Sequence, residues 1–391
     1  MANLSVNVGG LKMKNPVMIA SSPLTAKIEL LKEAEDNGAA AVSIKHAMMQ
    51  QKFKARPRWY FNRNIGIVVS GDPRLEPEYA CELVAKAKRE TGLTIVCNMS
   101  GAPGRLETWG QLASMLEQAG ADGIELNFNC PNLLSAEIKT AVQGANLGAD
   151  PEACSIVVAE VKKAVKIPII AKLNTEGGMT MKVAKACQES GADIMNIHAS
   201  FRAAPGINIY DGGKFLFPGT SKGNFGGHTG VWSRMITNRF IADIARALPG
   251  HALIGGSGLE KWDQIIECIM FGAQSVQICT SVLHKGFSII PPIVKGISDF
   301  MDRQGYETLE SIRGLSLNYI TEPSQMEYSD VAAVIDTGVC TGCKLCTRMP
   351  TCIAIDYNEK VKKCEVTREK CLGCGLCAGV CPNNAISMKI A

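Results

Sequence analysis

The sequence predicts an α/β fold: a (β/α)8 TIM barrel over residues 1–313, a linker over 314–335 and a small cysteine-rich domain over 336–391. Three observations lead to this prediction. Short apolar segments alternate with amphipathic segments through the first 280 residues. Turns of Gly-Ala or Gly-Ala-Asp recur between them, as at Gly120 and Gly191. Nine of the sixteen cysteines lie between Cys340 and Cys381.

The elements of the barrel follow one another from the N-terminus. Residues 4–13 alternate apolar and polar side chains around Gly9-Gly10, which is typical of a β-hairpin. Continuous apolar runs then predict eight strands, at 16–20, 40–45, 94–98, 123–129, 167–173, 193–199, 252–256 and 275–280. Helical periodicity lies between them at 106–119, 154–165, 179–190 and 261–271. Since such apolar runs favour a parallel sheet that is buried on both faces, eight of them predict a closed barrel.

Composition and charge exclude several classes of protein. A hydrophobic fraction of 46% with 20% charged residues is typical of a globular chain with a large core. A net charge of +4 requires no polyanion, so no nucleic-acid partner is expected. We find neither a signal peptide nor an apolar run long enough to cross a bilayer, so we expect no membrane partner and a cytoplasmic location. Crowded cysteines without a disulfide pattern indicate a reducing compartment.

Two cysteine runs define the C-terminal domain. Three cysteines at two-residue spacing, with a distal fourth, are the arrangement of a two-cluster bacterial ferredoxin, in which the fourth cysteine ligates the other cluster. Structural zinc instead takes its ligands in two pairs. The spacing therefore predicts two 4Fe–4S clusters, one held by Cys340, Cys343, Cys346 and Cys381 and the other by Cys371, Cys374, Cys377 and Cys352. The gap before Cys352 is two residues longer than usual, which leaves open whether Cys352 or Cys364 closes the second cluster; we take Cys364 as non-ligating.

Polar and small residues stand at the predicted strand ends, where a barrel of this type places its chemistry. Ser21, Lys45, Lys172 and the stretch from Asn127 to Cys130 supply the polar groups. Gly255-Gly256 and Cys279-Thr280 end the last two strands, and small residues there expose backbone N–H groups that suit a phosphate. The strand ends therefore favour a phosphate-bearing cofactor.

Four motifs carry a family resemblance: Glu-Leu-Asn-Phe-Asn-Cys-Pro-Asn at 125–132, Ala-Lys-Leu at 171–173, Gly-Gly-His-Thr-Gly at 226–230, and Gly255-Gly256. With them, residues 1–310 resemble the class 1 dihydroorotate dehydrogenase superfamily, and the appended cysteine runs match its dihydropyrimidine dehydrogenase branch. The resemblance implies a bound FMN. The positions that match the family's flavin contacts are Ala20, Ser21, Lys45, Asn98, Asn127, Lys172, Gly230, Gly255, Gly256, Cys279 and Thr280.

Cys130 is the predicted catalytic residue. Reduction of an activated C=C bond needs a hydride on one carbon and a proton on the other, and a thiol above the flavin can move that proton. Asn127, Asn132 and Ser200 are predicted to contact substrate, and residues 131–147 to form a lid. Two departures weaken the case for a pyrimidine: Ala199-Ser200 stands where relatives carry Asn-Thr, and another pyrimidine-binding asparagine, near the end of the third strand, falls in 66–70 without a counterpart.

The leading interpretation is a flavin- and iron–sulfur-dependent oxidoreductase acting on the C=C or CH–CH bond beside a carbonyl of uracil or thymine. The alternatives are the same chemistry on a more apolar conjugated carbonyl compound, a dihydroorotate dehydrogenase, and a non-catalytic electron-transfer subunit. The resemblance implies an electron-donating partner, either an FAD/NAD(P)H-type subunit or a ferredoxin, and a homodimer. The basic stretch at 45–63 is interpreted as a substrate loop or partner surface rather than an RNA-binding site.

Overall fold

The computed structural model describes residues 2–50, 55–130, 144–198 and 200–390. The chain divides into two compact units, Met1–Tyr319 and Ile320–Ala391, which are treated separately below. The predicted substrate residue Asn132 and residues 131–143 of the predicted lid lie outside the described residues. Among those described, no helix is long and apolar enough to span a membrane.

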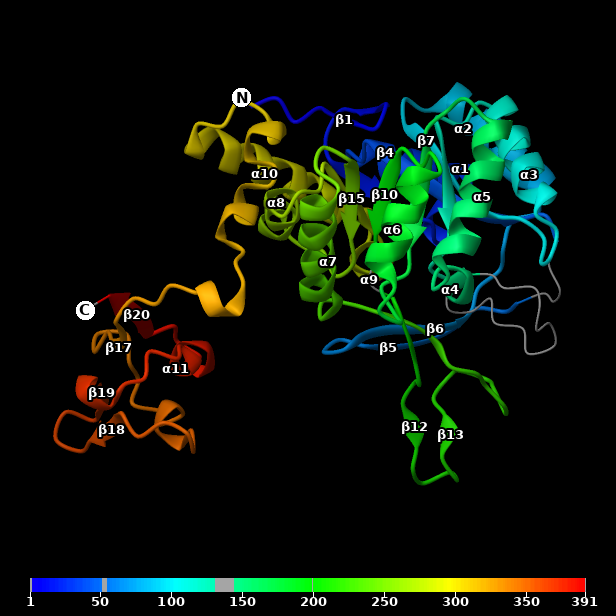
Figure 1. Ribbon diagram of the computed structural model, residues 1–391. Coiled ribbons are helices and arrows are strands. Elements are labelled where there is room, and N and C mark those ends of the chain that lie inside the picture. Colours follow the sequence, from blue (N-terminus) through cyan, green and yellow to red (C-terminus); the bar gives the residue numbers. More distant parts are fainter. Residues whose placement is uncertain (1, 51–54, 131–143, 199, 391) are drawn as a thin grey trace. The chain divides into compact units, whose positions relative to one another are not determined.

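The first unit is a closed barrel of parallel strands, which confirms the predicted fold class (Figure 1). The barrel closes because the last of its strands pairs with the first. Its strands, in chain order, are β3 (Val17–Ile19), β4 (Ala41–Met48), β7 (Thr94–Ser100), β8 (Gly123–Asn127), β9 (Ile169–Leu173), β10 (Ile194–Ile197), β15 (Ala252–Gly256) and β16 (Ser275–Ile278).

Amphipathic helices cover the outside of the barrel (Figure 1). Their starts follow local chemistry: Asp150 caps α5 by accepting the N–H groups of Glu152 and Ala153, and Pro151 occupies the first turn. The helices are α1 (Ile28–Asp36), α2 (Pro77–Glu90), α3 (Glu107–Gln118), α4 (Gly144–Leu147), α5 (Pro151–Ala164), α6 (Thr180–Glu189), α7 (Ser233–Ala247), α8 (Trp262–Met270), α9 (Thr280–Lys285) and α10 (Ile290–Gln304).

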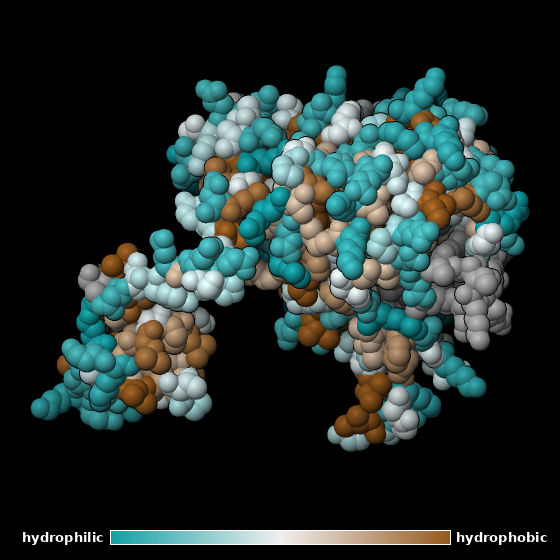
Figure 2. Space-filling model, viewed as in Figure 1, coloured by the Kyte–Doolittle hydropathy of each residue, from teal (hydrophilic) through white to brown (hydrophobic). Residues whose placement is uncertain are grey.

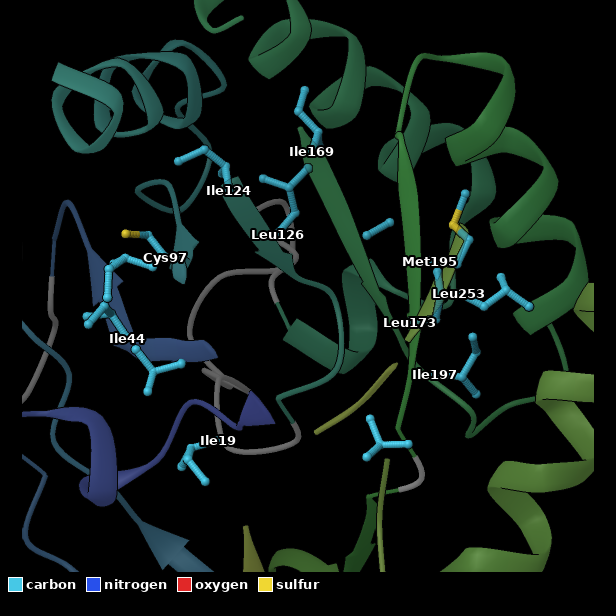
Figure 3. Close-up of a cluster of buried hydrophobic side chains, with 14 of the residues drawn as sticks. Ile19, Ile44, Cys97, Ile124, Leu126, Ile169, Leu173, Met195, Ile197 and Leu253 are labelled. Atoms are coloured by element: carbon cyan, nitrogen blue, oxygen red, sulfur yellow. The ribbon is translucent and has the colours of Figure 1, made fainter. Parts of the chain in front are cut away.

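The apolar core forms two layers because successive strand residues face opposite sides of the sheet. On β3, Val17 and Ile19 belong to the cluster between strands and helices, whereas Met18 belongs to a second cluster inside the barrel. Figure 3 shows part of the first cluster, including Ile44 and Leu126. The N-terminal hairpin, β1 (Val6–Val8) and β2 (Leu11–Met13), contributes Val8, Leu11 and Met13 to the second cluster. The hairpin therefore closes the end of the barrel at which the strands begin.

Two insertions build an antiparallel sheet at the other end, where the strands finish. One follows β4 and supplies β5 (Arg58–Asn62) and β6 (Gly66–Gly71); the other follows β10 and supplies β11 (Phe201–Ala203) and β14 (Gly226–Thr229). They pair in the order β11-β14-β6-β5. Segment 66–70, where the resemblance placed the end of the third barrel strand, belongs instead to β6 of this antiparallel sheet. The third barrel strand is β7.

The second insertion also carries a short hairpin, β12 (Ile207–Asn208) and β13 (Lys214–Phe215). Its tip exposes Ile209 and Tyr210, and Leu216 is exposed at its base. Figure 2 shows brown, apolar residues gathered on this arm.

The second unit is small, and its core contains several cysteine side chains. Strand β17 (Val331–Ile335) pairs with β20 (Ile386–Ile390), and β18 (Ile355–Asn358) pairs with β19 (Lys363–Val366). A short helix, α11 (Leu376–Val380), precedes β20. The buried core includes Cys340, Cys346, Cys364 and Cys377. Residues 331–335, which the sequence places in the linker, form β17 because this apolar run has a partner strand at the C-terminus.

Candidate active site and candidate cluster sites

A buried carboxylate, Glu125 on β8, organises the middle of the barrel. Its two oxygens accept hydrogen bonds from five side chains on five other strands, all of which point inward. The donors and their distances are Ser43 (3.2 Å), Asn98 (2.7 Å), Lys172 (3.2 Å), Asn196 (3.1 Å) and Gln277 (2.6 Å). Lys172 also donates to Gln277 Oε1 at 2.9 Å.

Glu125 stays ionised despite its burial. Removal from water alone would raise the pKa of the carboxyl group, but the charge of Lys172 and the hydrogen bonds from Gln277 and Asn98 outweigh it and lower the pKa. The carboxylate in turn keeps the ammonium of Lys172 fixed at the mouth of the barrel. A charged lysine is thereby presented to whatever occupies the mouth.

A second network of charged side chains lies beside Cys130, which follows β8. Arg74 Nη2 donates to Cys130 Sγ at 3.0 Å, and Arg74 Nη1 lies 3.4 Å from Asp72 Oδ2. Asp72 also pairs with Lys45 on β4, and all three charged side chains are largely buried. Burial lowers the pKa of Lys45 against the opposing attraction of Asp72, and Arg74 lowers it further. The thiol therefore lies inside a network of fixed charges.

Asn127 fixes the backbone that carries Cys130. Its Oδ1 accepts the N–H groups of Asn129 at 3.2 Å and Cys130 at 2.9 Å, while its Nδ2 donates to Asn98 at 2.8 Å. The neighbouring Asn129 donates to the backbone oxygen of His198, and its own Oδ1 is buried with no partner among the described residues. Asn127 therefore positions the loop, and Asn129 offers the free acceptor.

Two histidines at the mouth are held neutral. Burial lowers the pKa of His198 to about 3, and Lys172 adds to the shift. Burial, Arg74, Lys45 and Lys172 together place the pKa of His46 well below its ordinary value. His198 Nδ1 lies 2.9 Å from Ser257 Oγ, and His46 Nε2 lies 2.8 Å from Ser100 Oγ. Both rings therefore act as neutral hydrogen-bonding groups near physiological pH.

Two cavities open at this end of the barrel and meet. One, of about 160 Å³, is lined by Lys45, Asp72, Arg74, Cys130 and Lys172 among others. The other, of about 390 Å³, is lined by Gly230, Ser257, Gly258 and Ser281 among others. His198, Cys279 and Thr280 line both. The shared walls indicate one elongated site with a charged end and a glycine-rich end.

The glycine-rich end fits a phosphate-bearing ligand such as FMN. A Cβ on Gly258 would lie 2.5 Å from the backbone oxygen of Gly230, and the residue has a positive φ of 70° that favours glycine. A Cβ on Gly230 would lie 2.7 Å from Gly66 Cα. The hydroxyl of Ser281 is buried there and has no partner among the described residues. Close backbone approach and a spare donor are what such a ligand requires.

The structure brings most of the predicted site residues together. Those that line the elongated site are Ser21, Lys45, Asn127, Cys130, Lys172, Ser200, Gly230, Cys279 and Thr280. Asn98 lies behind Asn127, and Ala20 is buried at the end of β3. Gly256 faces the mouth, since its Cβ would lie 3.1 Å from His198 Nδ1. Gly255 instead faces the helices, because its Cβ would lie 2.8 Å from Ile241.

Arg74, Asp72, Glu125 and Gln277 have roles that sequence reasoning missed. Glu125 stands two residues before Asn127, and Gln277 two residues before Cys279 in the predicted strand 275–280, so period-two alternation could have placed them inside the barrel. Arg74 and Asp72 follow β6, a strand outside the barrel. Nothing in a search of barrel strand ends could have found them.

The cysteines of the second unit form two groups. Cys340, Cys343, Cys346 and Cys381 line one small cavity, and the N–H of Ala385 donates to Cys381 Sγ at 3.3 Å. Burial raises the pKa of the Cys377 thiol, and Cys352 and Cys371 raise it further. Cys374 is exposed. Within the described ranges no three His, Cys, Asp or Glu side chains could hold a single metal ion; the four thiolates of a cluster each bind a different iron and stand farther apart.

Comparison with known proteins decides the family. A family model described as dihydroorotate dehydrogenase matches residues 3–301, most of the barrel unit. The chain belongs to the dihydroorotate dehydrogenase family. A second model, the 4Fe-4S binding domain, matches residues 365–387, which hold the second cysteine run. Membership in the dihydroorotate dehydrogenase family implies FMN, and the second match implies an iron–sulfur cluster.

Curated relatives align either with nearly the whole chain or with about four fifths of it. The NAD-dependent dihydropyrimidine dehydrogenase subunit PreA of Escherichia coli is 26% identical over 402 residues, covering 99% of this chain and 95% of the relative. The catalytic subunit of dihydroorotate dehydrogenase B (NAD(+)) of Pyrococcus abyssi is 30% identical over 320 residues, covering 80% of this chain and 99% of the relative. The corresponding subunit of Thermococcus kodakarensis is 29% identical over 322 residues. The chain is therefore a flavin-dependent oxidoreductase of the dihydroorotate and dihydropyrimidine dehydrogenase type.

Proposed function

We propose that this chain is the catalytic subunit of an oxidoreductase that interconverts uracil or thymine with the 5,6-dihydropyrimidine. The observation that carries the proposal is the contact of Arg74 with Cys130 at 3.0 Å, directly beside the charged end of the elongated site. The Escherichia coli relative, a dihydropyrimidine dehydrogenase subunit, aligns across the cysteine-rich unit as well as the barrel. The dihydroorotate relatives align with the barrel only.

Cys130 is the proposed acid and base. In the reducing direction its thiol gives a proton to one carbon of the C=C bond, and in the oxidising direction the sulfur takes that proton back. Asn127 holds the backbone N–H of Cys130, and Arg74 holds its sulfur, so the thiol has a fixed direction. Such a fixed geometry is what proton transfer at carbon requires.

The remaining mouth residues bind and orient. FMN, when bound, supplies and accepts the hydride. Lys172 presents a positive charge that Glu125 and Gln277 hold in place. Asn129 Oδ1 and Ser200, at the wall of the 160 Å³ cavity, offer partners for an imide ring. The amide of Asn127 is already engaged by three protein groups, so its proposed contact with substrate is secondary to its hold on the loop.

A second candidate substrate, a more apolar conjugated carbonyl compound, has a specific observation in its favour. A cavity of about 430 Å³ adjoins the charged end and shares Pro23, Lys45, Trp59 and Asp72 with it. Its other walls are mostly apolar and include Pro57, Pro73, Leu75 and Pro218. A bare pyrimidine ring leaves this space unused, whereas a substrate with an apolar substituent would fill it and gain burial free energy.

The proposed electron path uses two 4Fe–4S clusters, held as the cysteine spacing predicts. The proposed partner is a separate FAD/NAD(P)H-type subunit or a ferredoxin that reduces these clusters, and the proposed catalytic subunit is a homodimer. The Escherichia coli relative is a subunit of an NAD-dependent enzyme, which supports such a partner. The electron-carrier alternative is disfavoured because a carrier has no use for a thiol held beside an open cavity.

A substrate panel tests the proposal. Anaerobically purified protein, reduced by a viologen dye, is mixed with uracil, thymine, orotate or a simple enone, and reoxidation of the flavin is followed by absorbance. Uracil or thymine is expected to reoxidise it. Reoxidation by enones alone would favour the apolar substrate, by orotate alone a dihydroorotate dehydrogenase, and by none of them the electron carrier.

A variant pair tests the role of Cys130 in the same assay. Cys130→Ala should still be reduced by the dye but lose product formation by about 100-fold or more. Cys81→Ala on α2, away from the site, is the control and should behave as wild type. Equal loss of flavin reduction and product formation in Cys130→Ala would contradict the assignment.

A further inference from the structure

A ninth cysteine lies in the second unit, and the two predicted clusters need only eight. This cysteine, Cys364, is on β19 and is 1% exposed. It lines the same small cavity as Cys340, Cys343, Cys346 and Cys381, the four proposed ligands of the first cluster. Five thiols therefore surround one cavity.

Cys364 belongs to the same buried cluster as Cys340 and Cys346, two of those four proposed ligands, and it lines the cavity beside them. Pairing of β19 with β18 holds it there, with Cys364 opposite Tyr357. The adjacent Lys363 ammonium bonds the backbone oxygen of Cys340, which ties the strand to the first cysteine run. Cys364 is therefore fixed at the edge of the first cluster site.

The second cluster site has no equivalent thiol. Its proposed ligands are Cys352, Cys371, Cys374 and Cys377, and every other cysteine of the second unit lines the first cavity. The position of Cys364 also bears on the long gap before Cys352. Cys364 lines the cavity of the first group of thiols, whereas Cys352 does not, so Cys352 is the better placed to close the second cluster.

We propose that Cys364 is a reserve ligand of the first cluster, able to bind the iron of Cys346 when that ligand is lost. The proposal rests on the two-cluster arrangement proposed above. The step would be a ligand substitution: the Cys364 thiol would release its proton to water, and its sulfur would displace the water or hydroxide that occupies the place of the missing Cys346 sulfur. No electron is transferred, and the iron and sulfide of the cluster are conserved.

The chain offers a matched control for the test. Cys346 and Cys377 are both the third cysteine of their run, and both are buried, but only Cys346 has a fifth thiol beside it. Full-length wild type, Cys346→Ala, Cys346→Ala/Cys364→Ala, Cys364→Ala and Cys377→Ala are purified anaerobically. Iron and acid-labile sulfide are measured per chain, and the oxidised proteins are examined by electron paramagnetic resonance for a 3Fe cluster. FMN content reports that the barrel is folded in each.

Wild type, Cys364→Ala and Cys346→Ala are expected to hold about eight irons per chain, the content of two 4Fe–4S clusters. Cys346→Ala/Cys364→Ala and Cys377→Ala are expected to fall to about seven or fewer and to show a 3Fe signal or loss of a cluster. Iron loss in Cys346→Ala as large as in Cys377→Ala would overturn the reserve role, as would full iron in the double variant. Wild type with only about four irons would instead overturn the two-cluster arrangement itself.

Discussion

Cys130, the proposed reacting thiol, adjoins a charged network whose arginine and aspartate lie outside the barrel strands. Arg74 reaches Cys130 from the turn after β6, and Asp72 joins Arg74 to Lys45 on β4. Because all of these groups are largely buried, loss of one leaves the others with unpaired charge. The direction of the Cys130 sulfur is thus a property of the group rather than of the loop alone.

Replacement of Arg74 tests this dependence. Arg74→Gln keeps a donor but removes the charge and one arm of the guanidinium, so the sulfur is held less well. We expect turnover to fall by about 10- to 100-fold. The measurement is the rate of product formation by dye-reduced enzyme. Arg89→Gln, an exposed position on α2, is the control and should be unchanged; wild-type turnover in Arg74→Gln would remove the arginine from the mechanism.

The neutral histidines make a prediction about pH. A histidine whose folded pKa is depressed contributes stability that is complete above the unfolded pKa of about 6.5 and is lost as pH falls towards the folded value. For His198, that value is about 3. The free energy of unfolding should therefore fall below pH 6.5, by at most about 1.4 kcal/mol per pH unit for this group.

Urea unfolding followed by tryptophan fluorescence measures this slope. All four tryptophans lie in the barrel unit, so the signal reports that unit. His198→Asn keeps a polar side chain near Ser257 but cannot titrate. Its stability should fall less steeply between pH 6.5 and 5 than that of wild type, and an identical slope would be inconsistent with a buried neutral His198.

At the scale of elements, the turn after β15 shapes the glycine-rich end. Gly258 combines a positive φ of 70° with close approach to the backbone of Gly230. A side chain there would have to displace backbone rather than a flexible side-chain end. The turn therefore requires glycine at position 258 for its backbone to lie against that of Gly230, at the wall of the larger cavity.

Gly258→Ala should therefore lose bound FMN while the barrel remains folded. Gly250→Ala is a matched control, because Gly250 also has a positive φ, of 79°, but its Cβ would meet nothing within 4 Å. In both variants the alanine must adopt a positive φ, which costs about 1 kcal/mol of backbone strain. Flavin absorbance per chain separates them: we expect a strong loss only in Gly258→Ala, and equal flavin content in the two would contradict the cradle.

The barrel strands could be found in the sequence, and the sheet above them could not. Each barrel strand is an apolar run bounded by turns, so burial on both faces leaves a local signal. Strands β11 and β14 are short and mixed, and β14 pairs with β6 more than 150 residues away, so no local pattern reveals them. For the same reason, no local pattern revealed that Arg74 and Asp72 lie at the site. Cys130, Lys172 and the cluster cysteines could be proposed from the sequence because strand ends and cysteine spacing are local features.

At the scale of the molecule, each unit has a core of its own. The barrel unit is held by apolar side chains and the second unit by a core that includes several cysteine sulfurs. Metal binding to such a small unit contributes directly to its folding. The two cofactors should consequently stabilise different parts of the chain.

Selective removal of each cofactor tests that division. Removal of iron by a chelator under oxidising conditions should disorder the second unit and leave the tryptophan-reported unfolding of the barrel nearly unchanged. Removal of FMN should lower barrel stability, by about 2.7 kcal/mol when free FMN had been at a hundred times its Kd. A parallel fall of both signals on iron removal would show the units to be one cooperative body.

Glu125 has one more consequence, for how the barrel assembles. Its partners come from β4, β7, β9, β10 and β16, so the carboxylate is fully compensated only when these strands have joined β8. An incomplete barrel would bury the Glu125 carboxylate in an apolar environment without its hydrogen-bond donors, at a cost of several kcal/mol. Partial intermediates of this kind are penalised, and the strands are expected to close together in a single concerted event.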